Sequence, residues 1–201
     1  GFLAVIVVFQ PELRTVLEKM GRTNLRKISI FNTQKNVLSD QIASVVDQVC
    51  ECAEDLSQNH IGGLMVFEMT TKLGDIIDTG ISVDSQVSAQ MLGTIFFPKT
   101  PLHDGAVVIR GSRIAAAGCL LPLSQRMEIS SSLGTRHRAA VGMSEVSDAL
   151  TIVVSEETGR ISYTRNGTIT TGISMEELRR VLTDALTPEK TFAARKKGAK
   201  V

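Results

Sequence analysis

The sequence contains no tryptophan and a single tyrosine, and its aromatic content is only 4%. A ligand pocket in this chain is therefore expected to be apolar rather than aromatic. Only three cysteines are present, Cys50, Cys52 and Cys119, with no CxxC pair and no histidine at ligand spacing. This pattern argues against a structural zinc site, and we expect reduced thiols that fill the core of a cytoplasmic domain.

No apolar run is long enough to cross a membrane alone. The opening residues, Gly1–Phe9, are almost wholly apolar, but a bilayer span needs about 20 residues. Basic residues follow this run at positions 14, 19, 22, 26 and 27, as they follow the cytosolic end of a membrane helix. From the residues alone, two interpretations stay open: a shortened membrane helix or a buried core segment.

The chain also lacks a strong net charge, since its formal charge is +1. Five basic residues lie between positions 190 and 200 with no acidic residue among them. The rest of the chain carries 17 basic against 21 acidic residues, a formal charge of −4. The basic face that nucleic acid requires is therefore not supported. We interpret the basic tail as a solvated terminus, with a membrane-surface or partner contact as the alternative.

Length and patterning predict one globular domain with appendages, because 201 residues with 43% apolar content can bury a sizeable core. Apolar residues at helical spacing predict helices over residues 40–56 and 136–146. A capping box of Ser174 and Glu177 predicts a further helix at its start. Shorter helical patterns occur over residues 10–21 and 82–96, the latter with Asp84 or Ser85 as its cap.

Strands are predicted between these helices. The compact apolar run Gly62–Glu68 begins with two glycines and is typical of a buried strand. Two short apolar runs flank Gly111-Ser112 and predict a hairpin, and two more flank residues 156–159. The expected fold class is therefore α/β, a single domain with a central mixed β-sheet flanked by helices.

A cluster of basic residues stands where a helix is predicted to begin. Gly134 and Thr135 precede Arg136, His137 and Arg138. The free backbone N–H groups and the positive dipole end of a helix favour an anion, and the two arginines add planar donor groups. The pattern predicts a polyphosphate cradle, with a solvated helix start as the alternative. No Walker phosphate loop, GxGxxG, HExxH or GxSxG motif is present.

Carboxylates occur at two strand ends. Asp104 precedes Gly105 directly before a predicted strand, where an ordinary turn is the alternative interpretation. Ser155, Glu156 and Glu157 end another strand, where a charged turn is the alternative. A carboxylate facing a polyphosphate cradle can hold a divalent cation or take a proton from an attacking hydroxyl group. Asp104 and one of these glutamates would complete a site for Mg²⁺ or Mn²⁺.

Two motifs, Asp104-Gly105-Ala106 and Arg136-His137-Arg138, resemble the defining motifs of the diadenylate cyclase (DisA_N-type) domain. The paired motifs are highly specific, and the opening segment FQPELRTVLEKMGR resembles the membrane-anchored CdaA-type subgroup. The resemblance implies a three-part organisation. Residues 1–29 would be the stub of a transmembrane helix and a juxtamembrane helix, residues 30–187 the catalytic domain, and residues 188–201 a basic tail.

The resemblance implies that the protein condenses two ATP molecules into cyclic di-3′,5′-AMP and releases two pyrophosphates. Asp104 would be the catalytic residue that activates the 3′-hydroxyl group, either through the metal or directly. Adenine would lie near residues 119–124, where backbone groups around Leu121 can bind its edge, and Leu120 provides an aliphatic platform where some relatives have an aromatic residue. The implied metal, Mg²⁺, Mn²⁺ or another divalent cation, would be held by Asp104, Glu157 and His103. The implied ATP-binding residues are Gly105, Ala106, Leu121, Gly134, Thr135, Arg136, His137, Arg138, Ser155 and Glu156.

The resemblance also implies partners. One domain would hold one ATP, so catalysis would require a face-to-face homodimer. The missing N-terminal helices would anchor the protein in the cell membrane with its catalytic domain in the cytoplasm, where a membrane regulator and a sugar-phosphate mutase would control it. No nucleic acid partner is expected.

Two other functions remain as alternatives to a diadenylate cyclase. One is a non-catalytic module that binds ATP or a cyclic dinucleotide, and the other is a metal phosphohydrolase that uses His103, Asp104 and His137.

Overall fold

The computed structural model describes residues 39–126 and 133–187. The chain divides into two units, Gly1–Asp40 and Gln41–Val201, and the described residues belong almost entirely to the second. The predicted helix over residues 10–21, the predicted membrane stub and the basic tail lie outside the described residues. Of the helices that the structure describes, none is both long enough and apolar enough to cross a membrane.

The described part of the chain forms one seven-stranded mixed sheet in the order β2-β4-β3-β1-β5-β6-β7. Strands β1 and β3 run parallel, and every other neighbouring pair is antiparallel. Gly63 pairs with Val154, and Ala106 pairs with Cys119. The starts of β1 and β3 therefore lie at the same end of the sheet as the ends of β4 and β5. The strands are β1 (Gly63–Phe67), β2 (Ile81–Gln86), β3 (Ala106–Arg110), β4 (Arg113–Cys119), β5 (Leu150–Val154), β6 (Ile161–Arg165) and β7 (Thr168–Thr171).

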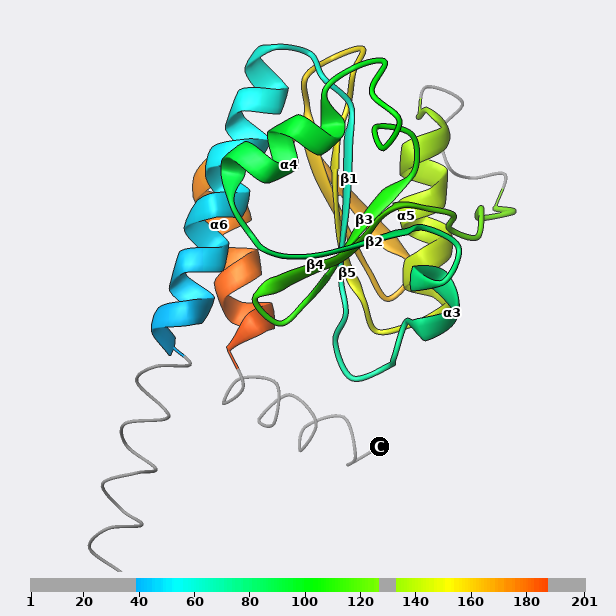
Figure 1. Cartoon of the computed structure of the whole chain (residues 1–201). Coiled ribbons are helices and arrows are strands. Elements are labelled where there is room, and N and C mark those ends of the chain that lie inside the picture. The colour runs from blue at the N-terminus through cyan, green and yellow to red at the C-terminus, as the bar shows by residue number, and fades with distance from the viewer. Residues whose placement is uncertain (1–38, 127–132, 188–201) are drawn as a thin grey trace, which may run out of the picture. The chain divides into compact units, whose positions relative to one another are not determined.

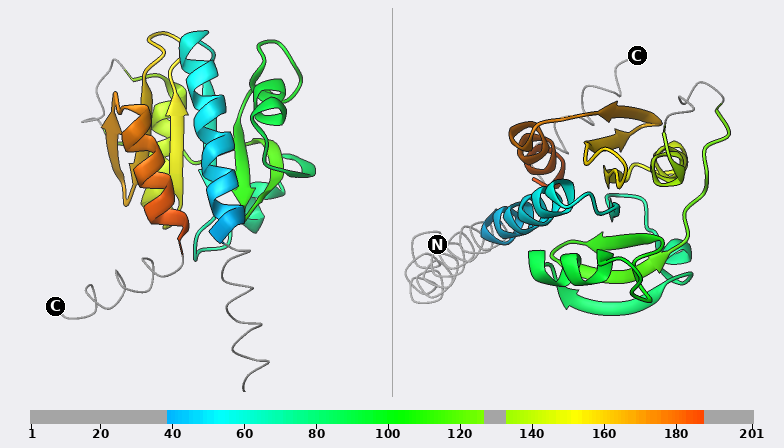
Figure 2. Two further views of the ribbon diagram at one scale, coloured as in Figure 1. Left: turned by 90° about the vertical axis from the view of Figure 1, so that its left-hand side faces the viewer. Right: turned by 90° about the horizontal axis from the view of Figure 1, so that it is seen from above.

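Helices cover both faces of this sheet (Figures 1 and 2). Because successive side chains of a strand point to opposite faces, Leu64 and Val66 of β1 pack in one apolar cluster and Met65 and Phe67 in another. The first cluster includes residues of α5 (Thr135–Val146) and lies beside α3 (Gly74–Ile77). The second includes the helix over residues 39–58, α4 (Ala89–Phe96) and α6 (Met175–Leu186). The predicted α/β class with a mixed sheet is confirmed.

Most predicted elements are present at their expected places. The helix expected over residues 40–56 covers residues 39–58, and β3 and β4 form the expected hairpin around Gly111, whose φ is 60°. The Oγ atom of Ser174 accepts the Glu177 N–H at 3.1 Å, which is one half of the predicted capping box. All three cysteines are free and buried, as expected for core residues.

The predicted helix over residues 82–96 is wrong in its first half. Residues Ile81–Gln86 form β2, and the helix begins only after Ser88, whose Oγ atom accepts the Met91 N–H at 3.2 Å. Strand β2 lies at the edge of the sheet and pairs with β4 alone. Pairing with a strand about thirty residues away outweighs the local helical pattern here. Strand β7 and helix α3 were not predicted either.

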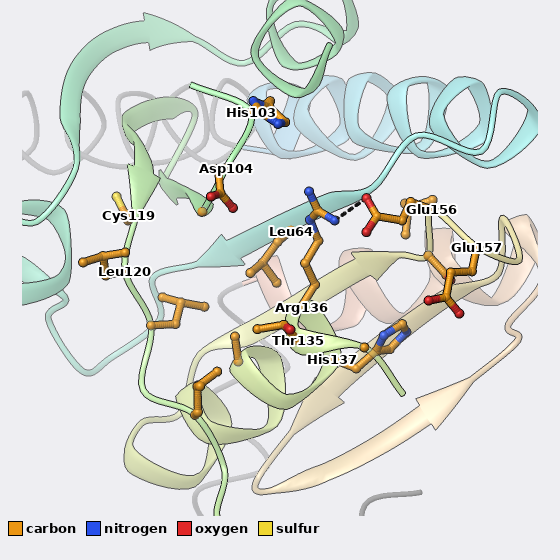
Figure 3. Close-up of a pocket in the computed structure, with 17 residues that line it drawn as sticks. Leu64, His103, Asp104, Cys119, Leu120, Thr135, Arg136, His137, Glu156 and Glu157 are labelled. Atoms are coloured by element: carbon orange, nitrogen blue, oxygen red, sulfur yellow. Dashed lines mark hydrogen bonds and ion pairs between the residues drawn. The ribbon is translucent and has the colours of Figure 1, made fainter. Parts of the chain in front are cut away.

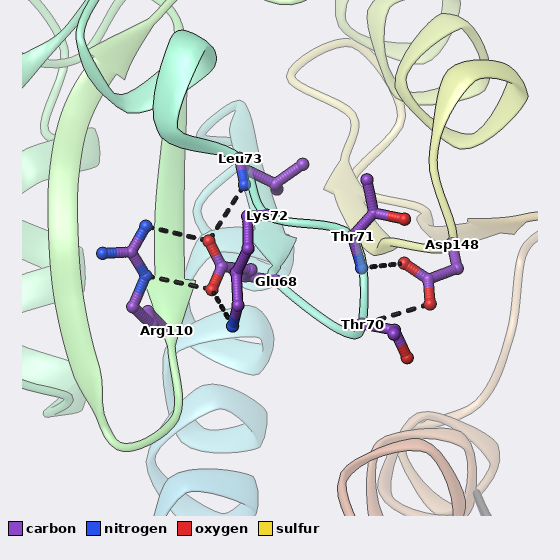
Figure 4. A network of polar contacts seen from close by, with 7 residues as sticks. All are labelled: Glu68, Thr70, Thr71, Lys72, Leu73, Arg110 and Asp148. Atoms are coloured by element: carbon purple, nitrogen blue, oxygen red, sulfur yellow. Dashed lines mark hydrogen bonds and ion pairs between the residues drawn. The ribbon is translucent and has the colours of Figure 1, made fainter.

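A buried carboxylate fixes the loop that leaves β1 (Figure 4). The Glu68 side chain is 1% exposed. Its two oxygens accept hydrogen bonds from Arg110 Nε at 3.0 Å and Nη2 at 2.9 Å. The Leu73 N–H and the Lys72 ammonium group also donate to it, each at 3.0 Å. The loop between β1 and α3 is therefore tied to β3.

Candidate active site

A pocket of about 730 Å³ lies at the end of the sheet where strands β1 and β3 begin and strands β4 and β5 end. The start of α5 forms one of its sides. Apolar side chains from the sheet and from the segment after β4 line it together with charged groups from two loops and from the start of α5. The lining includes His103, Asp104, Gly105, Gly134, Thr135, Arg136, His137, Ser155, Glu156 and Glu157, and the apolar residues Leu64, Cys119, Leu120, Leu121, Leu123, Ala139 and Val154.

The acidic motif and the basic motif thus share one pocket, although about thirty residues separate them in the sequence. Figure 3 shows the Asp104 carboxylate on the side of the pocket facing Thr135 and Arg136. Two of the predicted ATP-binding residues do not line it. Ala106 is fully buried beneath the site, and Arg138 donates from Nη2 to the Ser124 carbonyl oxygen at 3.3 Å, beside the segment that follows β4.

Asp104 directly precedes Gly105, where strands β3 and β4 approach each other closely. Gly105 has a φ of 107°, and a Cβ atom there would lie 2.7 Å from the Gly118 carbonyl carbon and 2.9 Å from the Cys119 carbonyl oxygen. Only glycine accommodates both that backbone conformation and that contact. The start of β3 is consequently pressed against the end of β4, and Asp104 stands exposed at the rim of the pocket.

The start of α5 offers donors to an anion. Gly134 occupies the N-cap position with extended backbone angles and no side-chain cap. The first N–H groups of a helix have no partner within the helix, and the helix dipole is positive at this end. Thr135 and Arg136 belong to this first turn and line the pocket. The arrangement suits a phosphate group, as the sequence predicts.

The guanidinium group of Arg136 is held by Glu156, in the acidic turn after β5. Its Nη1 atom donates to Glu156 Oε2 at 2.6 Å (Figure 3). The Arg136 side chain is 23% exposed, whereas that of Glu156 is 60% exposed. A ligand phosphate can therefore replace the glutamate as the partner of a guanidinium group that is already in place.

His137 is the buried member of the basic motif, at 6% exposure. Burial lowers the pKa of its imidazole below the ordinary value of 6.5, and the negative charge of Glu157 opposes that shift. The ring is therefore predominantly neutral at pH 7. A neutral imidazole can donate one hydrogen bond to a ligand without adding a full charge.

The three predicted metal ligands, His103, Asp104 and Glu157, all line the pocket. Nevertheless, no group of three histidine, cysteine, aspartate or glutamate side chains converges on one point within residues 39–126 and 133–187. Mg²⁺ is usually held by one or two carboxylates together with substrate phosphates, not by a closed protein cage. These side chains therefore fit a divalent cation that is coordinated partly by the protein and partly by the oxygens of a bound polyphosphate.

The apolar wall was only partly predicted. Leu121 was expected and lines the pocket, and Leu120 beside it is 68% exposed. Leu123, within the predicted segment 119–124, lines it as well, whereas Leu64 and Val154 were missed. Both missed residues lie at strand ends that meet at the pocket, and this meeting depends on a strand pairing that local patterns do not reveal.

The segment carrying this wall lies against α5. The Ser124 N–H donates to the Arg138 carbonyl oxygen at 3.1 Å. A Cβ atom at Gly142 would clash with the Pro122 carbonyl oxygen, so only glycine allows so close a crossing. The wall and the start of α5 are thus parts of one packed unit.

Comparison with known proteins agrees with this geometry. Residues 50–169 match the DAC family model, described as "DisA bacterial checkpoint controller nucleotide-binding". The chain is 44% identical over 182 residues to the cyclic di-AMP synthase CdaA of Bacillus subtilis, covering 90% of this chain and 65% of that protein. It is 38% identical over 144 residues to the diadenylate cyclase of Mycoplasma genitalium, covering 71% of this chain and 70% of that protein.

Solved structures agree as well. A crystal structure of a DacA double mutant from Staphylococcus aureus matches with a TM-score of 0.70 and 49% identity, over 71% of this chain and 95% of that one. A structure titled as a hypothetical membrane spanning protein from Bacillus cereus matches with a TM-score of 0.62 and 43% identity, over 64% of this chain and 63% of that one. The chain spans 65% of the length of its Bacillus subtilis relative, which is less than two thirds.

Proposed function

The chain belongs to the diadenylate cyclase (DAC) family, and from that premise we propose that it condenses two ATP molecules into cyclic di-3′,5′-AMP with release of two pyrophosphates. The observation that carries this proposal is the shared pocket of Asp104 and the start of α5. A pocket of about 730 Å³ is within the range of small-molecule sites. The relatives named as cyclases agree with the proposal.

In the proposed reaction, the 3′-hydroxyl oxygen of each nucleotide attacks the α-phosphorus atom of the other. A new oxygen–phosphorus bond forms, the bond to the β-phosphate oxygen breaks, and pyrophosphate leaves. Asp104 accepts the proton of the hydroxyl group, which is a role that a positioned carboxylate can fill. Most of the catalysis is then positioning and neutralisation of phosphate charge.

The phosphates are proposed to lie at the start of α5. The backbone of Gly134 and Thr135 and the side chains of Arg136 and His137 would bind them, assisted by Ser155, which also lines the pocket. Glu156 would release Arg136 when the phosphates arrive. The adenine ring would pack on the apolar wall that includes Leu121.

A divalent cation, Mg²⁺ or Mn²⁺, is proposed to accompany the nucleotide. It would neutralise phosphate charge, with Asp104, Glu157 and His103 as candidate protein ligands. Its other ligands would be phosphate oxygens and water. The protein's own part is to hold these side chains at the rim of one pocket.

Product identification tests the proposed activity. The purified protein is incubated with ATP and Mn²⁺ or Mg²⁺, and the products are separated by chromatography. Cyclic di-3′,5′-AMP and pyrophosphate are expected. Bound but unchanged ATP would support the alternative of a binding module, and AMP or ADP would indicate a phosphohydrolase.

Replacing Arg136 by alanine is expected to weaken ATP binding by about 10- to 100-fold, because a charge-assisted interaction with phosphate is lost. Titration calorimetry with ATP measures the effect. Arg160→Ala provides a control, since Arg160 is an exposed arginine that does not line the pocket. Unchanged affinity in Arg136→Ala would mean that this arginine does not bind the nucleotide.

A homodimer is proposed as the active form, because each chain would bring one ATP and the product has two-fold symmetry. Specific activity should therefore fall as the protein is diluted below its dimer dissociation constant, while ATP binding persists. Sedimentation at the same concentrations reports the oligomeric state. Constant specific activity in a demonstrated monomer would refute the dimer requirement.

We further propose that the protein is associated with the cell membrane, with residues 1–29 as the anchor side, residues 30–187 as the cytoplasmic catalytic domain and residues 188–201 as a basic tail. The proposal is supported by the CdaA relative and by the neighbour titled as a membrane spanning protein. A membrane regulator and a sugar-phosphate mutase are the proposed partners. No nucleic acid partner is proposed.

A further inference from the structure

Two adjacent glycines at the start of β1 have different neighbours. A Cβ atom at Gly62 would lie 2.5 Å from Arg136 Nη1, 2.7 Å from Arg136 Cζ and 2.9 Å from Glu156 Oε2. A Cβ atom at Gly63 would instead lie 2.7 Å from Leu56 Cδ1, within the core formed with the helix over residues 39–58. Gly62 therefore borders the pocket side of the sheet, and Gly63 borders the core.

The guanidinium group of Arg136 occupies the space that any side chain at position 62 would fill. Gly62 is buried, and its backbone forms the surface against which that group lies. Glu156 closes the same space from the other side through its 2.6 Å ion pair with Arg136. Three segments thus fix one cation: the residue before β1, the first turn of α5 and the acidic turn after β5.

We propose that Gly62 is a positioning residue for the phosphate-binding site, because the absence of a side chain there sets the place of the Arg136 guanidinium group. The proposal rests on the proposed function, in which Arg136 binds the triphosphate. Gly62 itself does not line the pocket. Its effect on binding passes through Arg136.

Replacing Gly62 by alanine is expected to weaken ATP binding by about tenfold. This is part of the affinity that the charge-assisted hydrogen bonds between Arg136 and the phosphates contribute. Binding of adenosine should not change, because adenosine has no phosphate for Arg136 to hold. The fold should adapt, since the displaced atoms are the ends of two flexible side chains. Titration calorimetry with ATP and with adenosine measures the difference.

A double-mutant cycle separates positioning from a general structural effect. In a chain that already carries Arg136→Ala, the Gly62→Ala change should have no further effect on ATP affinity, because the group that it displaces is absent. A tenfold loss that persists in this background would overturn the proposal. An equal loss of ATP and adenosine binding in Gly62→Ala alone would also overturn it.

Two glycine variants serve as controls. Gly63→Ala should lower the unfolding temperature through its clash with Leu56 and leave the ratio of ATP to adenosine affinity unchanged. Gly93→Ala should alter neither ligand's affinity, since a Cβ atom there meets nothing within 4 Å. If Gly62→Ala lowers the unfolding temperature as far as Gly63→Ala does, or fails to fold, Gly62 belongs to the core and the proposal is wrong.

The wild-type protein separates this proposal from the proposed function. If wild type binds no ATP, the proposed function fails, and with it the basis for a role of Gly62. If wild type binds ATP and Gly62→Ala binds it equally well, the role of Gly62 alone is refuted.

Discussion

Replacing Asp104 by asparagine is expected to lower the turnover of ATP by about 10²- to 10⁴-fold, the usual effect of losing a positioned proton acceptor. Asparagine has nearly the shape of aspartate but cannot take the proton from a 3′-hydroxyl group. Asp104 is exposed at the rim of the pocket and contributes nothing to the core. Folding should therefore be retained. Initial rates of cyclic di-3′,5′-AMP formation at saturating ATP measure the effect.

A matched control is Asp75→Asn, which removes an exposed carboxylate in the first turn of α3, away from the pocket lining. Its turnover should equal that of wild type. The unfolding temperatures of both variants should lie close to that of wild type. Full activity in Asp104→Asn would transfer the role of proton acceptor to Glu157, the other carboxylate predicted to hold the metal.

Replacing Glu68 by glutamine should destabilise the protein by about 3 kcal/mol at neutral pH. Burial alone would raise the pKa of Glu68, but hydrogen bonds from Arg110, the Leu73 N–H and Lys72 lower it from 4.5 to about 2. A carboxylate with a lowered pKa stabilises the folded state fully above its unfolded value of about 4.5. That contribution is lost as the pH falls from about 4.5 towards 2.

Denaturant unfolding of wild type and Glu68→Gln at several pH values tests this linkage. The difference in free energy of unfolding should be constant above about pH 5 and shrink steadily below pH 4.5. Asp84→Asn is the control, because the Asp84–Arg113 pair is exposed at 76% and 47% and should contribute less than about 1 kcal/mol. A difference for Glu68→Gln that does not vary with pH would contradict the account of Figure 4.

The sequence predicts elements whose determinants are local. The helix over residues 39–58 has an apolar face at helical spacing, and Ser174 with Glu177 marks the start of α6. The hairpin between β3 and β4 is set by Gly111 in its turn. Strand β2 was missed because pairing with β4 determines it, and its own residues alternate only weakly between exposed and half-buried positions.

The same distinction applies to the site. Asp104 and the first turn of α5 could be predicted because each stands at the end of an element with a recognisable pattern. Leu64 and Val154 could not, because they reach the pocket only through the pairing of β1 with β5. The contact of Gly62 with Arg136 joins residues 74 positions apart in the chain, and no local signal reveals it.

Arg138 shows the limit of motif reasoning. The motif predicts equal roles for Arg136 and Arg138, but residues two apart on a helix point in different directions. Arg136 lines the pocket, whereas Arg138 donates to the Ser124 carbonyl oxygen. Its role in binding ATP stays a prediction that the Arg136→Ala experiment can be extended to test.

The central claim is that Asp104 and the start of α5 form one reaction site, where the phosphates bound at α5 meet the 3′-hydroxyl group of the partner's nucleotide beside Asp104. A crystal structure of the protein with 3′-deoxyATP, which can bind but cannot react, tests it most directly. We expect the phosphates at the N–H groups of the first turn of α5 and beside Arg136, and the base on the wall that includes Leu121. We also expect Asp104 at the rim, open to the 3′ position of the partner molecule's nucleotide. A nucleotide bound elsewhere, or one whose phosphates lie away from α5, would contradict the account.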